Sequence, residues 1–166
     1  MPTDFLSVLR EFERVGIRYV LVGGLAVMLH GVDRLTADID LVVDLAPEEA
    51  AKAIRALLAL GFKPHAPVDA LGFADPALRE RWRTDAGMVV LSFWDPENRR
   101  PTVDLFTDYP MDFQTLLDHS IGMPLATVNV QVASIDDLVA IKRASGREKD
   151  LDDVQRLLEL QKGDLP

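Results

Sequence analysis

Short apolar runs alternate with helical patterns in the first quarter of the chain. Residues 19–22, Tyr-Val-Leu-Val, form a continuous apolar run that ends at Gly23 and Gly24, as is typical of a buried strand followed by a turn. Residues 25–30 have a helical pattern, which Gly31 ends. Residues 38–43, Asp-Ile-Asp-Leu-Val-Val, then predict a second strand. The expected order within residues 19–43 is strand, turn, helix and strand.

The rest of the chain mixes helical spacing with strand-like alternation. The predicted helices are residues 5–15 with Thr3 as N-cap and Gly16 as the end, 48–60, 112–120 with Asp112 as a cap, and two helices within 134–161, of which Ser134 caps the first. The predicted strands are 62–66 at an edge, 87–94, 102–106 and 127–132, with 87–94 and 102–106 antiparallel because their connection is short. Residues 68–84 have the least clear pattern, and we expect one or two helical turns there.

These elements predict an α/β (α+β) fold, in which a mixed sheet is covered by helices and a helical segment follows at 134–161. The length of 166 residues indicates a single domain over 1–166.

Two carboxylates share one face of the predicted strand at 38–43. Side chains alternate along a strand, so Asp38 and Asp40 point the same way, about 6–7 Å apart, while Ile39 points into the core. Two adjacent carboxylates repel each other, and no cation beside them in the sequence relieves this. A divalent cation such as Mg²⁺ gives a physical reason for the pair, because it binds carboxylate oxygens and keeps positions for substrate phosphates. The alternative is a solvated strand edge with two exposed carboxylates.

The glycine pair lies where the first strand turns into a helix. Backbone N–H groups at a helix N-terminus bind anions, and Gly23 and Gly24 carry no side chain that would block a phosphate. A tight strand-to-helix turn also requires glycine, and the two interpretations are compatible.

The order and spacing of these features match a known signature. The pattern Gly-Gly-x13-Asp-x-Asp resembles that of the DNA polymerase beta-type nucleotidyltransferase superfamily. The fuller phrase, GGLAVMLHG-x-x-R-x-T-x-DIDL, resembles its small bacterial branch, which includes AbiEii-like toxins and relatives of aminoglycoside and lincosamide nucleotidyltransferases. The resemblance implies an enzyme that moves an NMP from an NTP to an acceptor hydroxyl and releases pyrophosphate. Its cofactor would be Mg²⁺ or Mn²⁺, held by Asp38 and Asp40.

Members of the superfamily that the sequence resembles carry a third acid on a later strand, between apolar residues. Asp104 has this setting, between Val103 and Leu105, and an unpaired charge there would cost several kcal/mol. The resemblance makes Asp104 a metal ligand and the base near the attacking hydroxyl; a structural salt bridge is the alternative. It also assigns the β- and γ-phosphates of the nucleotide to Gly23 and Gly24.

Further residues match the family phrases. Arg34 is expected either to contact phosphate or to be an ordinary loop residue. Thr36 is expected to brace the loop. Lys142 lies in S-x-D-D-L-x-x-x-K…R-x-K-D-x-x-D, which resembles the C-terminal segment of the branch, and is expected either to bind a phosphate or to lie on a solvated helix face. His30 is expected to cap carbonyls. Trp82 is expected in the core with exposed arginines around it, rather than in an RNA-binding patch.

The net charge and the composition limit the classes of partner that the chain is expected to bind. The net charge of −9 argues against tight binding of nucleic acid by the whole surface, although RNA held briefly as a substrate stays possible. The chain has no Cys and no apolar run near the length of a membrane span, so we expect a cytoplasmic protein that does not bind membranes.

The acceptor is left open by the sequence. The first expectation is a toxin–antitoxin enzyme acting on RNA, such as a tRNA end, with a cognate antitoxin or toxin partner. The second is an antibiotic nucleotidyltransferase, and the third is an antitoxin-like protein that works through a protein partner.

Overall fold

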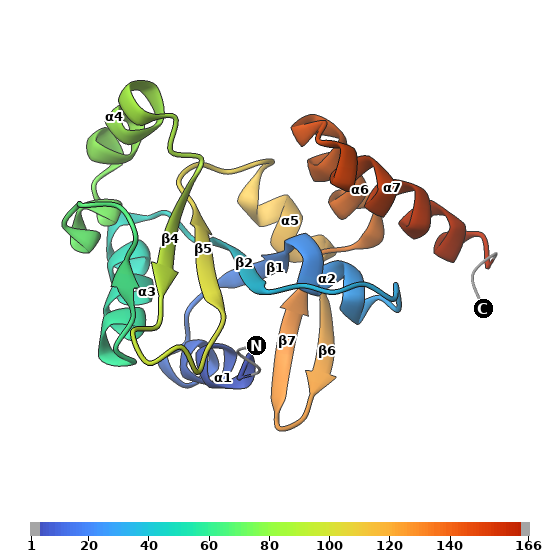
Figure 1. The fold of residues 1–166 in the computed structure, drawn as a ribbon, viewed down its shortest axis with the longest axis horizontal. Coiled ribbons are helices and arrows are strands. Elements are labelled where there is room, and N and C mark those ends of the chain that lie inside the picture. The colour runs from blue at the N-terminus through green and yellow to red at the C-terminus, as the bar shows by residue number, and fades with distance from the viewer. Residues whose placement is uncertain (1–3, 164–166) are drawn as a thin grey trace.

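The computed structural model describes residues 4–163, which form a seven-stranded mixed sheet with helices around it (Figure 1). The strands are β1 (Tyr19–Val22), β2 (Asp38–Val43), β3 (Lys63–Pro64), β4 (Val90–Trp94), β5 (Thr102–Phe106), β6 (Ile121–Leu125) and β7 (Val128–Val132). The α-helices are α1 (Leu6–Val15), α2 (Gly23–Leu29), α3 (Pro47–Ala59), α4 (Pro76–Ala86), α5 (Phe113–His119), α6 (Ile135–Ser145) and α7 (Glu148–Gln161), and η1 (Ala70–Ala74) is a 3-10 helix. The predicted α/β class is confirmed.

The strand order is β3-β4-β5-β2-β1-β7-β6. Strands β2 and β5 are parallel neighbours near the centre, β4 is antiparallel to β5 as predicted, and β1 is antiparallel to β2. This order brings the strand at 102–106 directly beside the strand at 38–43, although 58 residues separate Val43 from Thr102 in the sequence. The topology thus places the two predicted acid-bearing strands side by side.

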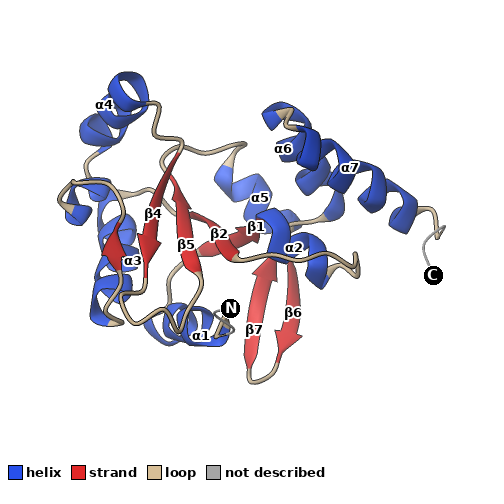
Figure 2. Ribbon diagram, viewed as in Figure 1, coloured by secondary structure: helices blue, strands red, loops and turns tan. Residues whose placement is uncertain are grey.

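The central strands have one apolar face and one polar face. Ile39, Val103, Leu105, Leu91 and Phe93 are all fully buried, and they alternate with polar residues along β2, β5 and β4. In Figures 1 and 2, α1 and α3 lie behind these strands, and within residues 4–163 no helix is drawn over the front of β4 and β5. The polar side chains therefore lie on the face of these strands that α1 and α3 do not cover, which we call the open face of the sheet.

A turn built on one carboxylate connects β4 to β5. Asp95 accepts hydrogen bonds from the backbone N–H groups of Glu97, Arg99 and Arg100 at 3.1–3.2 Å and from the Arg100 side chain at 3.0 Å. These bonds hold the pKa of Asp95 down at about 2, with the Arg100 hydrogen bond as the largest cause. The turn stabilises the pairing in which Ser92 lies opposite Asp104.

Several predicted ends and caps are confirmed. Gly16 ends α1 in the left-handed conformation, and Asp112 and Ser134 accept backbone hydrogen bonds at the starts of α5 and α6. Thr3, the predicted cap of the first helix, lies outside the described residues; Asp4 accepts a hydrogen bond from the Ser7 backbone at 3.0 Å.

Two regions differ from the prediction. Residues 68–84, where one or two helical turns are expected, contain η1 and most of α4, whose starts are capped by Asp69 and Asp75. Strand β6 was not predicted: it pairs with β7 in a hairpin at the sheet edge and contains Pro124, which strand patterns rarely include. Across residues 4–163, none of the helices combines the length and the apolar character needed to cross a membrane.

Candidate active site

The three predicted acids lie on the open face of two neighbouring strands. Asp40 of β2 pairs in register with Asp104 of β5, and Asp38 pairs with Thr102 one step along the same face. On the far side of Asp104 lies Ser92 of β4. The sheet therefore brings together three carboxylates that are up to 66 residues apart in the sequence.

Burial and mutual repulsion disfavour charge on these acids. The pKa of Asp40 is raised to about 7, first by burial and then by the charges of Asp104 and Asp38, while Lys142 and Arg147 oppose the shift. Burial also raises the pKa of Asp104, against the effect of the Ser92 hydroxyl. The Oδ1 atom of Asp104 is buried and has no hydrogen-bond partner among residues 4–163. A buried carboxylate oxygen without a partner fits a position that a cation or a hydroxyl fills during function.

The carboxylates are not arranged as a finished metal site. Within residues 4–163, no group of three or more His, Cys, Asp or Glu side chains is placed to hold a metal ion. The metal role of Asp38, Asp40 and Asp104 thus stays a prediction.

Gly23 packs directly against Asp40. Its φ of +70° is in the left-handed region, and a Cβ added to it would lie 2.6 Å from Asp40 Cγ, well inside van der Waals contact. Only glycine fits here for both reasons. The start of α2 and the carboxylate of β2 are therefore in direct contact.

Gly24 is covered by the loop that leads to Asp38. A Cβ on Gly24 would lie 2.9 Å from Thr36 Oγ1 and 3.0 Å from Arg34 Cζ. The Thr36 hydroxyl donates to the Asp38 carbonyl at 3.4 Å, a long bond that agrees with a bracing role. The structure thus gathers Gly24, Arg34 and Thr36 at one point beside the acids.

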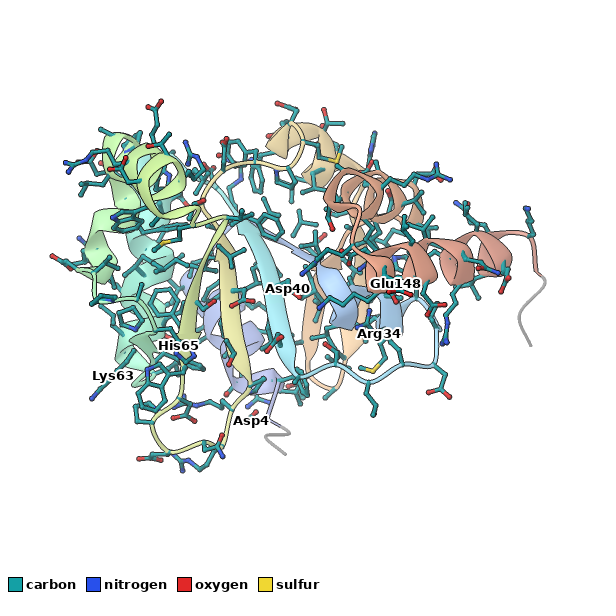
Figure 3. All side chains as sticks on the ribbon, turned by 45° about the horizontal axis from the view of Figure 1, so that its top comes forward. Asp4, Arg34, Asp40, Lys63, His65 and Glu148 are labelled. Carbon is teal, nitrogen blue, oxygen red and sulfur yellow. The ribbon has the colours of Figure 1, made fainter. Side chains whose placement is uncertain are left out.

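Arg34 is held by the C-terminal helix. Its guanidinium forms an ion pair with Asp153 of α7, and its side chain is 23% exposed. In Figure 3, Arg34 lies on the same flank of Asp40 as Glu148, at the start of α7. The ion pair does not test the predicted contact of Arg34 with phosphate. The guanidinium has five N–H donors, and the Asp153 carboxylate occupies only some of them.

Lys142 is buried, so the alternative in which it lies on a solvated helix face is wrong. The residue is 6% exposed, and its ammonium donates to Asp153 at 2.8 Å and to Asp150 at 3.4 Å. Asp150 and Asp153 lie one turn apart on α7, so the i,i+3 and i,i+4 spacings within α6 do not identify them as partners of Lys142. The spacing D-x-x-D in the C-terminal phrase was the available signal for them. Lys142 acts on Asp40 through its charge.

Two neighbouring expectations have mixed outcomes. His30 Nε2 lies 2.7 Å from the Ala133 carbonyl, so the ring serves a carbonyl of the β7–α6 connection rather than of its own helix. Arg79, expected to be exposed beside Trp82, is 6% exposed and donates to the carbonyls of Phe73 and Leu45. That arginine is structural.

The open face extends to residues that sequence reasoning missed. His65 follows β3, and its backbone N–H donates to the Ser92 carbonyl at 2.9 Å. Its ring stacks on Trp94 with centroids 6.0 Å apart and an interplanar angle of 26°. The alternation of β4 was the signal, because it places Ser92 and Trp94 on the face opposite the buried Leu91 and Phe93.

Known proteins provide a comparison for the sequence and for the fold. A family model described as "Nucleotidyl transferase AbiEii toxin, Type IV TA system" matches residues 5–166. No curated protein matches the sequence.

Similar solved structures share the fold. The lincosamide antibiotic adenylyltransferase LnuA, solved with lincomycin bound, has a TM-score of 0.62 at 18% identity, covering 93% of this chain and 96% of its own. The antibiotic-resistance factor ANT(2'')-Ia has a TM-score of 0.60 at 12% identity, covering 97% and 85%. An antigenic nucleotidyltransferase-like protein from Paracoccidioides brasiliensis has a TM-score of 0.59 at 18% identity, covering 93% and 73%.

Proposed function

The chain belongs to the AbiEii nucleotidyltransferase toxin family, and from this premise we propose that it transfers an NMP from an NTP to an acceptor hydroxyl, with release of pyrophosphate. The observation that carries the proposal is the register of Asp40 with Asp104 on the open face, directly beside the glycine turn. In the proposal, residues 1–166 act as one minimal transferase domain.

The donor set fits a hard divalent cation. Asp38, Asp40 and Asp104 would hold Mg²⁺ or Mn²⁺, and two observations support this. Asp104 Oδ1 is buried without a hydrogen-bond partner among residues 4–163, and burial, together with the charges of Asp104 and Asp38, raises the pKa of Asp40 to about 7. When bound, the cation would neutralise the triphosphate and the charge that develops at the α-phosphorus. The cation would also relieve the repulsion that the three acids exert on one another.

The glycine side of the site would bind the leaving pyrophosphate. Gly23 and Gly24 would bind it through their backbone N–H groups, because they form the first residues of α2 and carry no side chain of their own. Arg34 lies against Gly24 and has guanidinium donors left after its ion pair with Asp153. Lys142 would contribute to phosphate binding through its charge, from its buried position behind the acids. Thr36 would hold the loop between these groups.

Asp104 would accept the proton of the acceptor hydroxyl. As that oxygen attacks, its bond to the α-phosphorus forms and the bond from phosphorus to the pyrophosphate oxygen breaks. Burial raises the pKa of Asp104, which makes it a better base than an exposed aspartate. The rate acceleration would come mainly from positioning and charge, because the protein forms no covalent bond with the substrate.

RNA is the acceptor that we propose, with the chain acting as the toxin of a toxin–antitoxin pair; the family description supports this reading. An antibiotic is the second candidate, because the LnuA structure of similar fold is described as a lincosamide adenylyltransferase. An antitoxin-like binding role has less support, since all three acids and both glycines are present.

A transfer assay separates these acceptors. The protein with Mg²⁺ and each labelled NTP is incubated with total RNA, with aminoglycosides and lincosamides, or without acceptor. We expect label on RNA, and Asp104→Asn should remove it. Label on an antibiotic would replace RNA as the acceptor, and no transfer by a folded protein would contradict the proposed activity.

A further inference from the structure

The open face continues from Asp104 across β4 to the edge strand β3. Residue pairing defines two rows of side chains on this face. One row contains Asp40, Asp104, Ser92 and His65, and the next contains Asp38, Thr102, Trp94 and Lys63. The acids thus lie at one end of each row, and an aromatic or basic group lies at the other.

In-line chemistry assigns opposite roles to the two ends. In phosphoryl transfer, the attacking oxygen and the leaving oxygen lie on opposite sides of the phosphorus. If the pyrophosphate leaves toward Gly23 and Gly24, beside Asp40, the acceptor must approach from the side of Asp104 that is remote from α2. That side carries Ser92, Trp94 and His65.

The side chains at this end are accessible. Trp94 is 39% exposed although it is a large apolar residue, and His65 and Lys63 are exposed as well. Figure 3 shows Lys63 and His65 across β4 and β5 from Asp40. The stacked His65–Trp94 pair leaves an aromatic surface open beside the proposed base.

We propose that Trp94 and His65 form the acceptor subsite, on which the terminal base of a single-stranded RNA stacks while its ribose hydroxyl reaches Asp104. Lys63 contributes a positive charge to the RNA backbone at the sheet edge. The inference rests on the proposed function for its reaction, but the binding surface stands on its own geometry.

An aromatic platform favours a nucleotide over an antibiotic. Every nucleobase has a flat π face that stacks on Trp or His, and such stacking is tolerant of sequence. Saturated amino-sugar rings have no such face, and their cationic groups would be drawn to the carboxylates instead. The chain's net charge of −9 also means that RNA affinity must come from local contacts such as these.

Transfer kinetics provide the first test. Trp94→Ala should lower kcat/KM for RNA about ten- to a hundredfold, mainly through KM, as the loss of one stacked base implies. Trp94→Phe should keep most of the activity. The rise in melting temperature caused by a non-hydrolysable NTP with Mn²⁺ should be the same in all three proteins. Transfer to RNA by Trp94→Ala at the wild-type KM would overturn the proposal, as would equal dependence on Trp94 for transfer to an antibiotic.

Fluorescence provides a test that needs no catalysis. The chain has two tryptophans, so Trp82→Phe leaves Trp94 as the sole emitter. A short single-stranded RNA should quench its emission, and the same RNA with an abasic 3′ end should quench it much less. Equal quenching by both strands, or none by either, would overturn the subsite. Quenching without transfer in the wild type would uphold the subsite and contradict the proposed reaction.

Discussion

Gly23 and Asp40 occupy adjoining space, so each restricts what the other position can hold. The absent side chain of Gly23 leaves room for the Asp40 carboxylate, and its positive φ starts α2 at that point. The glycine is therefore part of the acid site as well as of the turn. Spacing alone identified both residues, but their contact depends on the pairing of β1 with β2, where Val22 lies opposite Asp40.

Substitution of Gly23 should affect activity more than stability. Gly23→Ala would displace the Asp40 carboxylate, and we expect transfer to fall by more than about a hundredfold, as misplaced catalytic groups generally cause. Unfolding stability should fall by about 1–3 kcal/mol, from the positive φ and the overlap. Gly16→Ala is a matched control, because Gly16 has a φ of +76° and nothing within 4 Å of an added Cβ. Kinetics and urea denaturation check both variants; similar activity losses in the two would contradict the contact.

The raised pKa of Asp40 predicts how stability depends on pH in the absence of metal. A carboxyl group with a pKa near 3.9 when unfolded and about 7 when folded is neutral in both states at low pH. Between about pH 4 and 7 the unfolded chain loses this proton first, so the free energy of unfolding falls as the pH rises and levels off above 7. Asp40→Asn stays neutral throughout. In EDTA, its gain over wild type should grow from near zero at about pH 4 to about 2–4 kcal/mol above pH 7.

Urea denaturation at several pH values measures this gain. Asp85→Asn, on the exposed face of α4, is the control and should change stability by less than about 0.5 kcal/mol. A gain for Asp40→Asn that is the same at every pH would show that the Asp40 charge is not the cause.

Elements with strong periodicity could be predicted from the sequence, and those defined by distant contacts could not. The strands that carry Asp38, Asp40 and Asp104 follow from their alternation with buried residues. The α4 helix has few apolar residues and is defined by the Asp75 cap, and β6 depends on β7 as its partner. Periodicity carries no information about such pairing.

The partners of the site residues could not be predicted from the sequence for the same reason, as the α6–α7 pair shows. Sequence spacing within α6 gives Lys142 no partner, but α7 folds back and supplies Asp150 and Asp153. Asp153 also binds Arg34, so the two basic residues that flank the acids share one buried carboxylate. The C-terminal helices thereby position residues of the glycine–aspartate segment.

Removing Lys142 should destabilise the fold. Lys142→Ala leaves the buried carboxylates of Asp150 and Asp153 without their ammonium partner, and breaking a buried ion pair typically costs about 3–5 kcal/mol. Lys149→Ala, one helix away and exposed, is the control and should change stability by less than about 0.5 kcal/mol. Urea denaturation distinguishes the two, and near-equal midpoints would show that the Lys142 pairs contribute little.

At the scale of the whole molecule, the net charge of −9 includes the three acids at which a nucleotide and its cation are proposed to bind. Mn²⁺ with a non-hydrolysable NTP, at about a hundred times the dissociation constant, should add about 2.7 kcal/mol of stability and raise Tm by about 5–10 °C. Asp38→Asn/Asp40→Asn should show no rise. Differential scanning calorimetry measures both, and an equal rise in the double variant would place the binding elsewhere.

The ion pairs of Asp153 with Arg34 and Lys142 have a consequence for the synthesis of the chain. The acids at 38 and 40 leave the ribosome early, whereas the carboxylate that positions Arg34 and neutralises Lys142 follows more than a hundred residues later. At about 5–20 residues per second, this interval lasts on the order of 5–20 s. For most of its synthesis, a nascent chain therefore has the strand that carries the acids but lacks the α7 carboxylate that pairs with Arg34 and Lys142. These ion pairs therefore form only when α7 has emerged and folded back.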